Sequence, residues 1–186
     1  MANSTNDSWQ PLRGYTSARI ALGRVGVATS TAVNLQFQLD HARARDAVHQ
    51  GLNVDALAAV CTASLADIAG NHRQHLLPAI QLSSQAGDRH GYLQRPDLGR
   101  QLPELQWQAL AERGASQVPI DVVVIVGDGL SSAAVSAHAA PVLAMLIAGL
   151  AELGLQLGPL CIASQARVAL ADDIGEALGA SLSVIL

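Results

Sequence analysis

The sequence predicts an α/β protein, a Rossmann-like doubly wound parallel sheet with an N-terminal helical region. From about Pro78 onward, short apolar segments alternate with helical segments over short connections, which is typical of βαβ units. The strongest strand candidate, Ile120–Val126, is β-branched and apolar on both faces, as central strands of parallel sheets are. We therefore expect a sheet domain over residues 78–186 and a helical region over residues 1–77.

Two segments of the first part carry apolar residues at helical spacing, Ala32–Gln50 and Val54–Ile68. We expect a helix in each. The segment before them, Thr16–Gly26, is too rich in glycine for a helix.

The second part is expected to continue through helices and strands in turn. A helix from Ser131 should break near Pro141, because proline lacks a backbone N–H, and should end at Gly154. Another helix is expected over Asp172–Leu178, with Gly179 placed to end it. The remaining strands are expected at Ile80–Ser83, Leu160–Ala163 and Leu182–Leu186. Because the sequence stops inside the last strand, we expect this domain to be truncated at its C-terminal end.

Composition narrows the classes of partner. Half of the residues are hydrophobic but only 3% are aromatic, so the core must consist of Ala, Val, Leu and Ile. Charged residues make up 14% of the chain, against about 25% in typical soluble domains. This deficit indicates surface buried against partner chains, although an alanine-rich composition alone would also produce it. The net charge of −4 leaves no basic stripe for a phosphate backbone, so no nucleic-acid partner is expected.

The expected compartment is the cytoplasm, without membrane association. Cys61 and Cys161 lie far apart in apolar settings, which favours two buried thiols over a disulfide framework. Met1–Gln10 is polar and lacks the apolar core of a secretion signal. Gly129–Ala151 carries no formal charge and is long enough to cross a bilayer, but serines, a histidine and Pro141 interrupt it. A buried helix is therefore the favoured interpretation.

Two loops are candidates for a ligand site, because ligands of open parallel sheets bind where strands end at their carboxyl edge. One is Gly127–Leu130, after the strongest strand, and the other is Ser164–Val168. The glycines of the first loop would let the backbone approach a ligand, beside the free N–H groups of the next helix. From loop position we expect Asp128, Gly129 and Arg167 to contact a ligand, although tight βα turns use such residues for geometry alone.

No catalytic or metal-binding residue is predicted. The sequence contains no Gly-x-Ser-x-Gly elbow, phosphate-binding lysine loop or Gly-x-Gly-x-x-Gly fingerprint. His72 and His75 stand three apart with no carboxylate or cysteine beside them, so a metal site is not expected there. Asp172, Asp173 and Glu176 are interpreted as N-terminal helix charge and a solvated face. This inventory is typical of a binding subunit rather than a complete enzyme.

A series of stretches along nearly the whole chain resembles one enzyme family, each at the corresponding place in the chain. The family is the small subunit of the adenosylcobalamin-dependent ethanolamine ammonia-lyase. The stretches are Ser17–Arg19, Gly23–Gly26, Asp40–Val48, Tyr92–Arg100, Gly127–Ser131, Ala166–Leu170 and Asp173–Glu176.

The resemblance implies a lyase that converts ethanolamine to acetaldehyde and ammonia through a deoxyadenosyl radical supplied by adenosylcobalamin. In this family the large subunit carries the radical chemistry, and the small subunit closes over the cobalamin at the interface. The implied partner is that large subunit, in a hetero-oligomer of several large and small pairs. The implied location is the cytoplasm, with a bacterial microcompartment as the alternative. Packaging there uses a longer N-terminal extension in family members, whereas this chain reaches the matched Arg19 early.

Carried over residue by residue, Val168 falls at a cobalamin contact of the family, in the second candidate loop. Two further family contacts, a Glu and a Cys, correspond to sequence beyond Leu186, and neither Glu176 nor Cys161 replaces them. His90 stands in a partial match to the Asp-x-His-x-x-Gly pattern, whose histidine ligates cobalt. Leu93 stands at its glycine position, and the family is expected to bind cobalamin with its own base attached.

Two other function classes stay open. A Rossmann-type nucleotide-binding module is disfavoured because no phosphate fingerprint follows any expected strand. A purely structural subunit would pack against a large partner and touch no cofactor. A cobalamin titration of the large subunit with and without this chain would separate these classes.

Overall fold

The computed structural model describes residues 8–16, 18–66, 74–115 and 118–186. The chain divides into two compact units, unit 1 (Met1–Asp46) and unit 2 (Ala47–Leu186), and each is described by itself. Of the residues considered above, residues 1–7, Ser17, Ile68 and His72 lie outside the described part.

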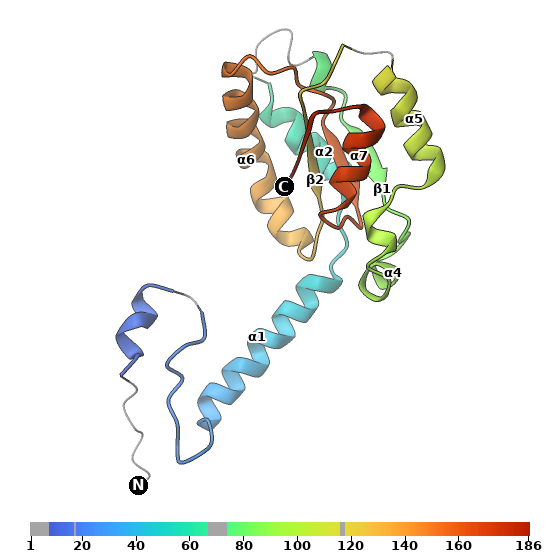
Figure 1. Ribbon diagram of the computed structural model, residues 1–186. Coiled ribbons are helices and arrows are strands. Elements are labelled where there is room, and N and C mark those ends of the chain that lie inside the picture. Colours follow the sequence, from blue (N-terminus) through green and yellow to red (C-terminus); the bar gives the residue numbers. More distant parts are fainter. Residues whose placement is uncertain (1–7, 17, 67–73, 116–117) are drawn as a thin grey trace. The chain divides into compact units, whose positions relative to one another are not determined.

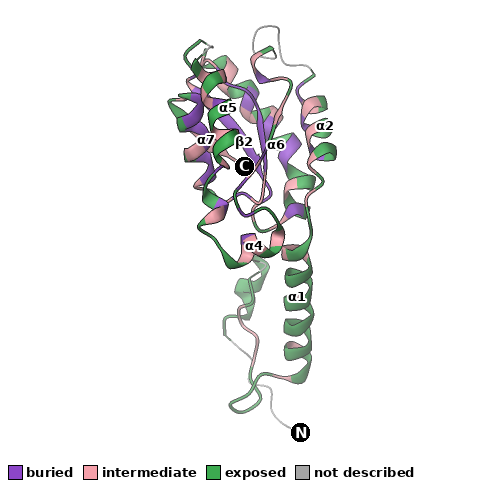
Figure 2. Ribbon diagram, turned by 90° about the vertical axis from the view of Figure 1, so that its right-hand side faces the viewer, coloured by how far each residue is buried: buried purple, intermediate pink, exposed green. Residues whose placement is uncertain are grey.

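The described residues of unit 1 form no buried core. They contain a short 3-10 helix, Gln10–Gly14, and most of helix α1, Thr31–His49. Every described side chain of this unit is exposed or half-buried, and α1 is largely in the exposed colour in Figure 2. Ring contacts occur within this unit: the guanidinium carbon of Arg19 lies 4.6 Å from the ring centroid of Phe37, which also stacks on His41.

Unit 2 is built on a parallel four-stranded sheet with the strand order β1-β3-β2-β4. Strand β3 pairs with both β1 and β2, and β4 pairs with β2. Strand β2 is buried at every position, as its run of β-branched residues predicts for a central strand. The strands are β1 (Ile80–Ser83), β2 (Val122–Gly127), β3 (Cys161–Ser164) and β4 (Leu182–Ile185).

Helices cover both faces of this sheet, so the apolar residues separate into two cores (Figure 1). Because side chains alternate along a strand, Val124 packs on the face of α2 and α6, while Val123 packs on the face of α5 and α7. The helices are α2 (Val54–Ser64), α4 (Arg89–Gln94), α5 (Glu104–Ala115), α6 (Ser132–Glu152) and α7 (Leu170–Leu178).

Short polar side chains begin several of these helices. Asn53, Asp88 and Ser131 each accept a hydrogen bond from a backbone N–H of the first turn of α2, α4 and α6. Gly179 ends α7 with a φ of +66°, a left-handed conformation that glycine adopts without strain, as predicted.

The predicted break at Pro141 is wrong, because α6 runs without interruption from Ser132 to Glu152. Pro141 lies on the exposed side of the helix. The carbonyl group that its missing N–H leaves unpaired belongs to the exposed Ala137, where water can satisfy it. The second predicted helix is also shorter than expected, since α2 ends at Ser64.

Helix α6 is, within the described residues, the one helix long and apolar enough to cross a membrane by length and composition. Leu143 and Ile147 on one face are fully buried in the core, whereas Val142 and Met145 on the other are exposed. The helix expected to be buried is therefore half-buried.

The α/β class and the parallel sheet are confirmed. The narrower Rossmann-like, doubly wound description stays a prediction. Units 1 and 2 divide at Ala47. Leu57, Cys61 and Leu65, on and just after α2, pack into the core with α6 and the sheet. The predicted domain boundary between residues 77 and 78 stays a prediction.

The two edges of the sheet differ in how their backbone groups are occupied. On β1, the N–H of Ser83 donates to the side chain of Gln106 at 3.1 Å, and that amide donates back to the Ser83 hydroxyl at 3.2 Å. On β4, the N–H groups of Leu182 and Leu186 donate to β2 or the residue before it. Backbone groups of the alternate residues Ser183 and Ile185 therefore point away from β2.

Candidate functional site

The loops after β2 and β3 meet at the carboxyl edge of the sheet, as predicted. They line a common pocket of about 330 Å³ together with the last residues of the chain. Its walls are mainly apolar, and among the predicted residues Asp128, Gly129 and Val168 contribute to them. The lining is Gly127–Ser131, Ala134, Val135, Ala166, Val168, Ile185 and Leu186.

Two apolar side chains at this pocket are open to solvent. Val168 is 77% exposed and Leu130 is 54% exposed. Gly129 supplies the turn between β2 and Leu130, with a φ of +48° and open space where a side chain would stand. The pocket therefore presents an apolar surface that a ligand could remove from water.

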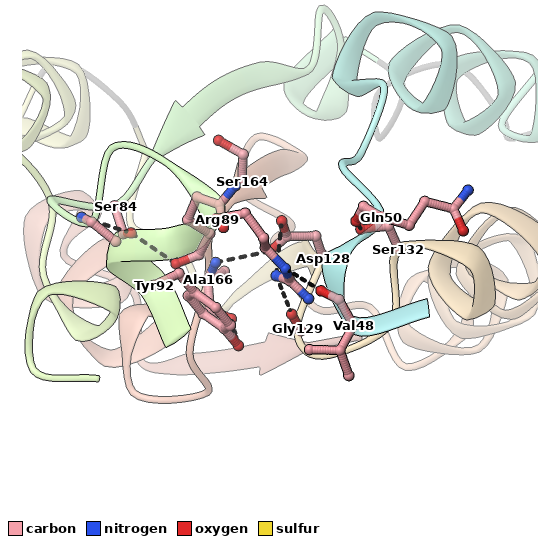
Figure 3. A network of polar contacts seen from close by, with 12 residues as sticks. Val48, Gln50, Ser84, Arg89, Tyr92, Asp128, Gly129, Ser132, Ser164 and Ala166 are labelled. Carbon is pink, nitrogen blue, oxygen red and sulfur yellow. Dashed lines mark hydrogen bonds and ion pairs between the residues drawn. The ribbon is translucent and has the colours of Figure 1, made fainter. Parts of the chain in front are cut away.

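Asp128 is buried beneath the pocket and ties the two loops together (Figure 3). Its Oδ1 accepts a hydrogen bond from the backbone N–H of Ala166 at 2.9 Å, and its own N–H donates to the Ala163 carbonyl at 3.3 Å. Its side chain is 1% exposed. The carboxylate thus holds the loop after β3 in place, and Asp128 also lines the pocket.

The charge of Asp128 is balanced by Arg89, the first residue of α4. Arg89 Nη1 lies 3.8 Å from Asp128 Oδ2 and donates to the Gly129 carbonyl at 2.8 Å. Its Nε donates to the carbonyl of Val48 at 2.6 Å. Because both charged groups are shielded from water, this pair is more sensitive to the loss of one partner than a surface pair would be.

Tyr92 lies next to the same network, in contact with two arginines. The guanidinium carbons of Arg89 and Arg167 lie 4.7 and 4.3 Å from its ring centroid, within the range of a cation–π interaction. Its hydroxyl donates to the Ala166 carbonyl at 3.3 Å. Burial raises the pKa of Tyr92, and the two arginines oppose that rise. In this arrangement the phenol is a hydrogen-bond donor to the loop after β3.

The structure places the four predicted site residues in two roles. Asp128, Gly129 and Val168 line the pocket, whereas Arg167 does not. Its guanidinium donates to the Tyr92 carbonyl at 3.1 Å and stacks on the ring of that residue. Sequence reasoning missed Arg89 as part of the site, since a single arginine carries no spacing signal. The matched stretch Tyr92–Arg100 did point to the region.

Other candidate residues lie elsewhere. His90 is exposed on α4 and does not line the pocket. Within the described part of the chain, no group of three or more potential metal ligands exists. Asp173 does more than charge a solvated face, because its carboxylate accepts a hydrogen bond from the Leu102 N–H at 2.6 Å. Cys61 and Cys161 are buried free thiols, as predicted.

Comparison with known proteins assigns the family. The family model of the ethanolamine ammonia-lyase light chain (EutC) matches residues 6–186. The ethanolamine ammonia-lyase small subunit of Ralstonia nicotianae is 45% identical over 186 residues, covering 100% of this chain and 65% of the relative. The subunit of Pseudomonas aeruginosa is 46% identical over 184 residues (98% and 63%), and that of Azotobacter vinelandii is 45% identical over 189 residues (98% and 64%).

This chain therefore spans 63–65% of the length of these relatives. The match extends from residue 6 to residue 186 and includes both loops of the pocket. The chain belongs to the ethanolamine ammonia-lyase light chain family.

Proposed function

We propose that this chain acts as the small subunit of an ethanolamine ammonia-lyase and contributes one wall of its adenosylcobalamin site. The observation that carries the proposal is the family match over residues 6–186, within which both carboxyl-edge loops fall. The proposed reaction is the deamination of ethanolamine to acetaldehyde and ammonia. The large subunit is the proposed partner, in a hetero-oligomer located in the cytoplasm or in a bacterial microcompartment.

The size and the apolar lining of the pocket support contact with one part of a large cofactor. A cavity of about 330 Å³ lies at the small end of the range for drug-sized ligands, about 300–1,000 Å³. It is thus suited to one side of a corrinoid and not to the whole group. The exposed side chains of Val168 and Leu130 would lose their contact with water when such a group covers them.

In this proposal the residues of the chain bind and position the cofactor. Val168 and the backbone of Gly129 would contact it, while Asp128 and Arg167 hold the two loops from below. Adenosylcobalamin, when bound, supplies the radical that begins the reaction. The substrate-handling groups are assigned to the large subunit, in line with the absence of a predicted catalytic residue in this sequence.

A structural subunit without cofactor contact is the second candidate function. The charge content of 14% supports this candidate, because interfaces between subunits are depleted in charged residues. The two functions differ at the pocket, because a structural subunit needs no apolar surface there.

The first experiment mixes purified components. The chain alone, given ethanolamine and adenosylcobalamin, should produce no acetaldehyde, and addition of the large subunit should restore turnover. The affinity of the large subunit for cobalamin should rise when this chain is present. Turnover by the isolated chain would remove the subunit assignment, and an unchanged affinity would favour the structural alternative.

The second experiment places a charge in the pocket. Val168→Asp in the assembled complex should weaken cobalamin binding by more than about tenfold, because an unpaired carboxylate would be buried against an apolar ligand edge. Val118→Asp is the matched control. Val118 is also exposed, but it precedes β2 and so lies toward the amino ends of the strands, away from the carboxyl-edge pocket. Equal affinity of the two variants, both correctly assembled, would exclude Val168 from the site.

A further inference from the structure

We propose that Arg89 is the positioning residue of the carboxyl-edge pocket and sets the arrangement of both loops through Asp128 and Tyr92. The geometric part of this inference depends on unit 2 alone. The part that concerns cofactor affinity rests on the proposed function.

Arg89 connects α4 to two other segments of the chain through one side chain (Figure 3). Its Nε donates to Val48, its Nη1 donates to Gly129, and the same nitrogen faces the carboxylate of Asp128. The side chain is only 11% exposed. Hydrogen bonds from two different nitrogens require the rigid fork of a guanidinium, which the single ammonium of a lysine does not provide.

In the loop after β3, the three consecutive residues Gln165–Arg167 each form a hydrogen bond with another segment of the chain. The carbonyl of Gln165 accepts from the Ser84 hydroxyl at 2.7 Å. Ala166 is held on both sides, since its N–H donates to Asp128 and its carbonyl accepts from the Tyr92 hydroxyl. The N–H of Arg167 donates to the Gly99 carbonyl at 2.8 Å. Val168 comes directly after these tethered residues, so its position at the pocket depends on them.

The backbone of this loop needs such support. Gln165 has a φ of +54°, a left-handed conformation that costs a residue with a side chain free energy. A residue stays in this conformation only where neighbouring contacts hold it. The bonds to Gln165 and Ala166 supply those contacts, and the one through Asp128 requires a carboxylate whose charge Arg89 balances.

Glycine at position 99 allows the network to close. A Cβ added to Gly99 would lie 2.7 Å from Arg167 Cγ and 3.2 Å from Tyr92 Cδ2. The close approach lets the Arg167 side chain stack on the ring of Tyr92, whose other cationic neighbour is Arg89. The two arginines and the tyrosine are thus packed as one block beneath the loop.

The test compares two conservative substitutions on the same helix region. Arg89→Lys keeps the charge but loses the fork, and Arg95→Lys is the matched control because the Arg95–Asp97 pair is largely exposed. In hydrogen–deuterium exchange on the whole chain, Arg89→Lys should speed exchange of the Ala166 and Arg167 amides by about tenfold through local opening. Arg95→Lys should leave both amides unchanged.

Cofactor titration of the complete enzyme then tests the second part. Arg89→Lys should raise the cobalamin concentration needed for half-maximal rate by about tenfold, with kcat at saturating cofactor unchanged. A purely structural defect would instead lower the amount of active enzyme and leave the half-saturating concentration the same. If Arg89→Lys does not fold, Tyr92→Phe removes only the hydroxyl that donates to Ala166 and should give smaller changes of the same kind.

The outcomes distinguish the two proposals. Unchanged exchange at Ala166 and Arg167 in both Arg89→Lys and Tyr92→Phe would overturn the positioning role of Arg89. Faster exchange with an unchanged half-saturating cobalamin concentration would overturn the proposal that this pocket forms one wall of the adenosylcobalamin site. Faster exchange with a higher half-saturating concentration supports both.

Discussion

Units 1 and 2 use different residues and expose them differently. Residues 1–46 contain three of the five aromatic residues of the chain, and these are exposed. Residues 47–186 instead bury aliphatic side chains in two cores on either side of a sheet. Charge differs as well, with five arginines and three aspartates in residues 1–46 against six arginines and twelve acidic residues in the remainder. The exposed aromatic residues are Trp9, Tyr15 and Phe37.

This contrast shows that the overall composition averages two kinds of surface. Aromatic residues and arginine are enriched at protein interfaces, whereas a core of Val, Leu, Ile and Ala supports a domain by itself. The low charge content of the whole chain predicted that part of its surface is buried against partner chains, but it did not indicate which part. Large apolar side chains lie on the surface of both units, but the exposed aromatic ones among the described residues belong to unit 1. That some of this surface is buried against partner chains stays a prediction.

The largest expected effect separates a core leucine from a surface leucine. Leu143→Ala, at a fully buried position on α6, should lower the free energy of unfolding by about 2–5 kcal/mol, through lost burial and a residual cavity. Leu35→Ala on α1, where the side chain is 60% exposed, should change it by less than about 0.5 kcal/mol. Urea unfolding followed by circular dichroism measures both.

A loss at Leu35 as large as that at Leu143 would break the comparison. It would mean that α1 is packed against something in the isolated chain, and unit 1 could not then be described as free of a core.

A smaller effect is expected from adding one methyl group to a glycine. A Cβ at Gly114 on α5 would lie 2.6 Å from the Leu178 carbonyl oxygen on α7, which is backbone and cannot move aside. Gly114→Ala should therefore cost about 1–3 kcal/mol by pushing α5 from α7. Gly14→Ala in unit 1 meets nothing within 4 Å and should be neutral. Thermal unfolding of the two variants should differ clearly, and equal midpoints would contradict the close packing of α5 on α7.

The smallest effect concerns pH and a buried thiol. Burial raises the pKa of Cys161 from 9.0 to about 12. The folded state thus favours the neutral thiol, so this stabilisation is complete below pH 9 and is lost as the pH rises toward 12. Between pH 8 and pH 10 we expect about 1 kcal/mol of stability to be lost on this account. Unit 1 has no cysteine, so it contributes nothing to the loss of stability that thiol ionisation causes.

The measurement compares urea unfolding at pH 8 and pH 10 in the wild type and in Cys161→Ala. The variant should lose less stability over this interval than the wild type. An equal loss in both proteins would show that the thiol is ionised in the folded state and that the core beside β3 admits water.

The sheet was predictable from sequence to within two residues for each strand. The β-branched run of β2 carries a direct signal, and the other strands follow from short apolar segments that alternate with helical ones. Helix α5 was not predicted. Its Leu105 is exposed, and Leu110 is its one buried residue among those described, so the apolar spacing that marks a helix face is weak. The half-buried Trp107 adds little to that spacing.

The candidate site was predictable only in part. The position of Asp128 and Gly129 at the pocket was predictable because loops at the carboxyl edge of parallel strands are recognisable from strand order. That these residues contact a ligand stays a prediction. That the Asp128 side chain turns inward to Ala166 depends on Arg89, which approaches from α4 and is distant in sequence. Contacts of this kind follow from packing, and no local pattern encodes them.

The two edge strands of the sheet, β1 and β4, differ in how readily a further strand could pair with them. The outward N–H of β1 at Ser83 already has a partner in Gln106, so a further strand would have to displace that side chain. On β4 the outward backbone groups of Ser183 and Ile185 have no such side chain in front of them among the contacts of the described residues. A strand added beside β1 would therefore have to displace Gln106 at Ser83, whereas one added beside β4 would meet no such bonded side chain at Ser183 and Ile185.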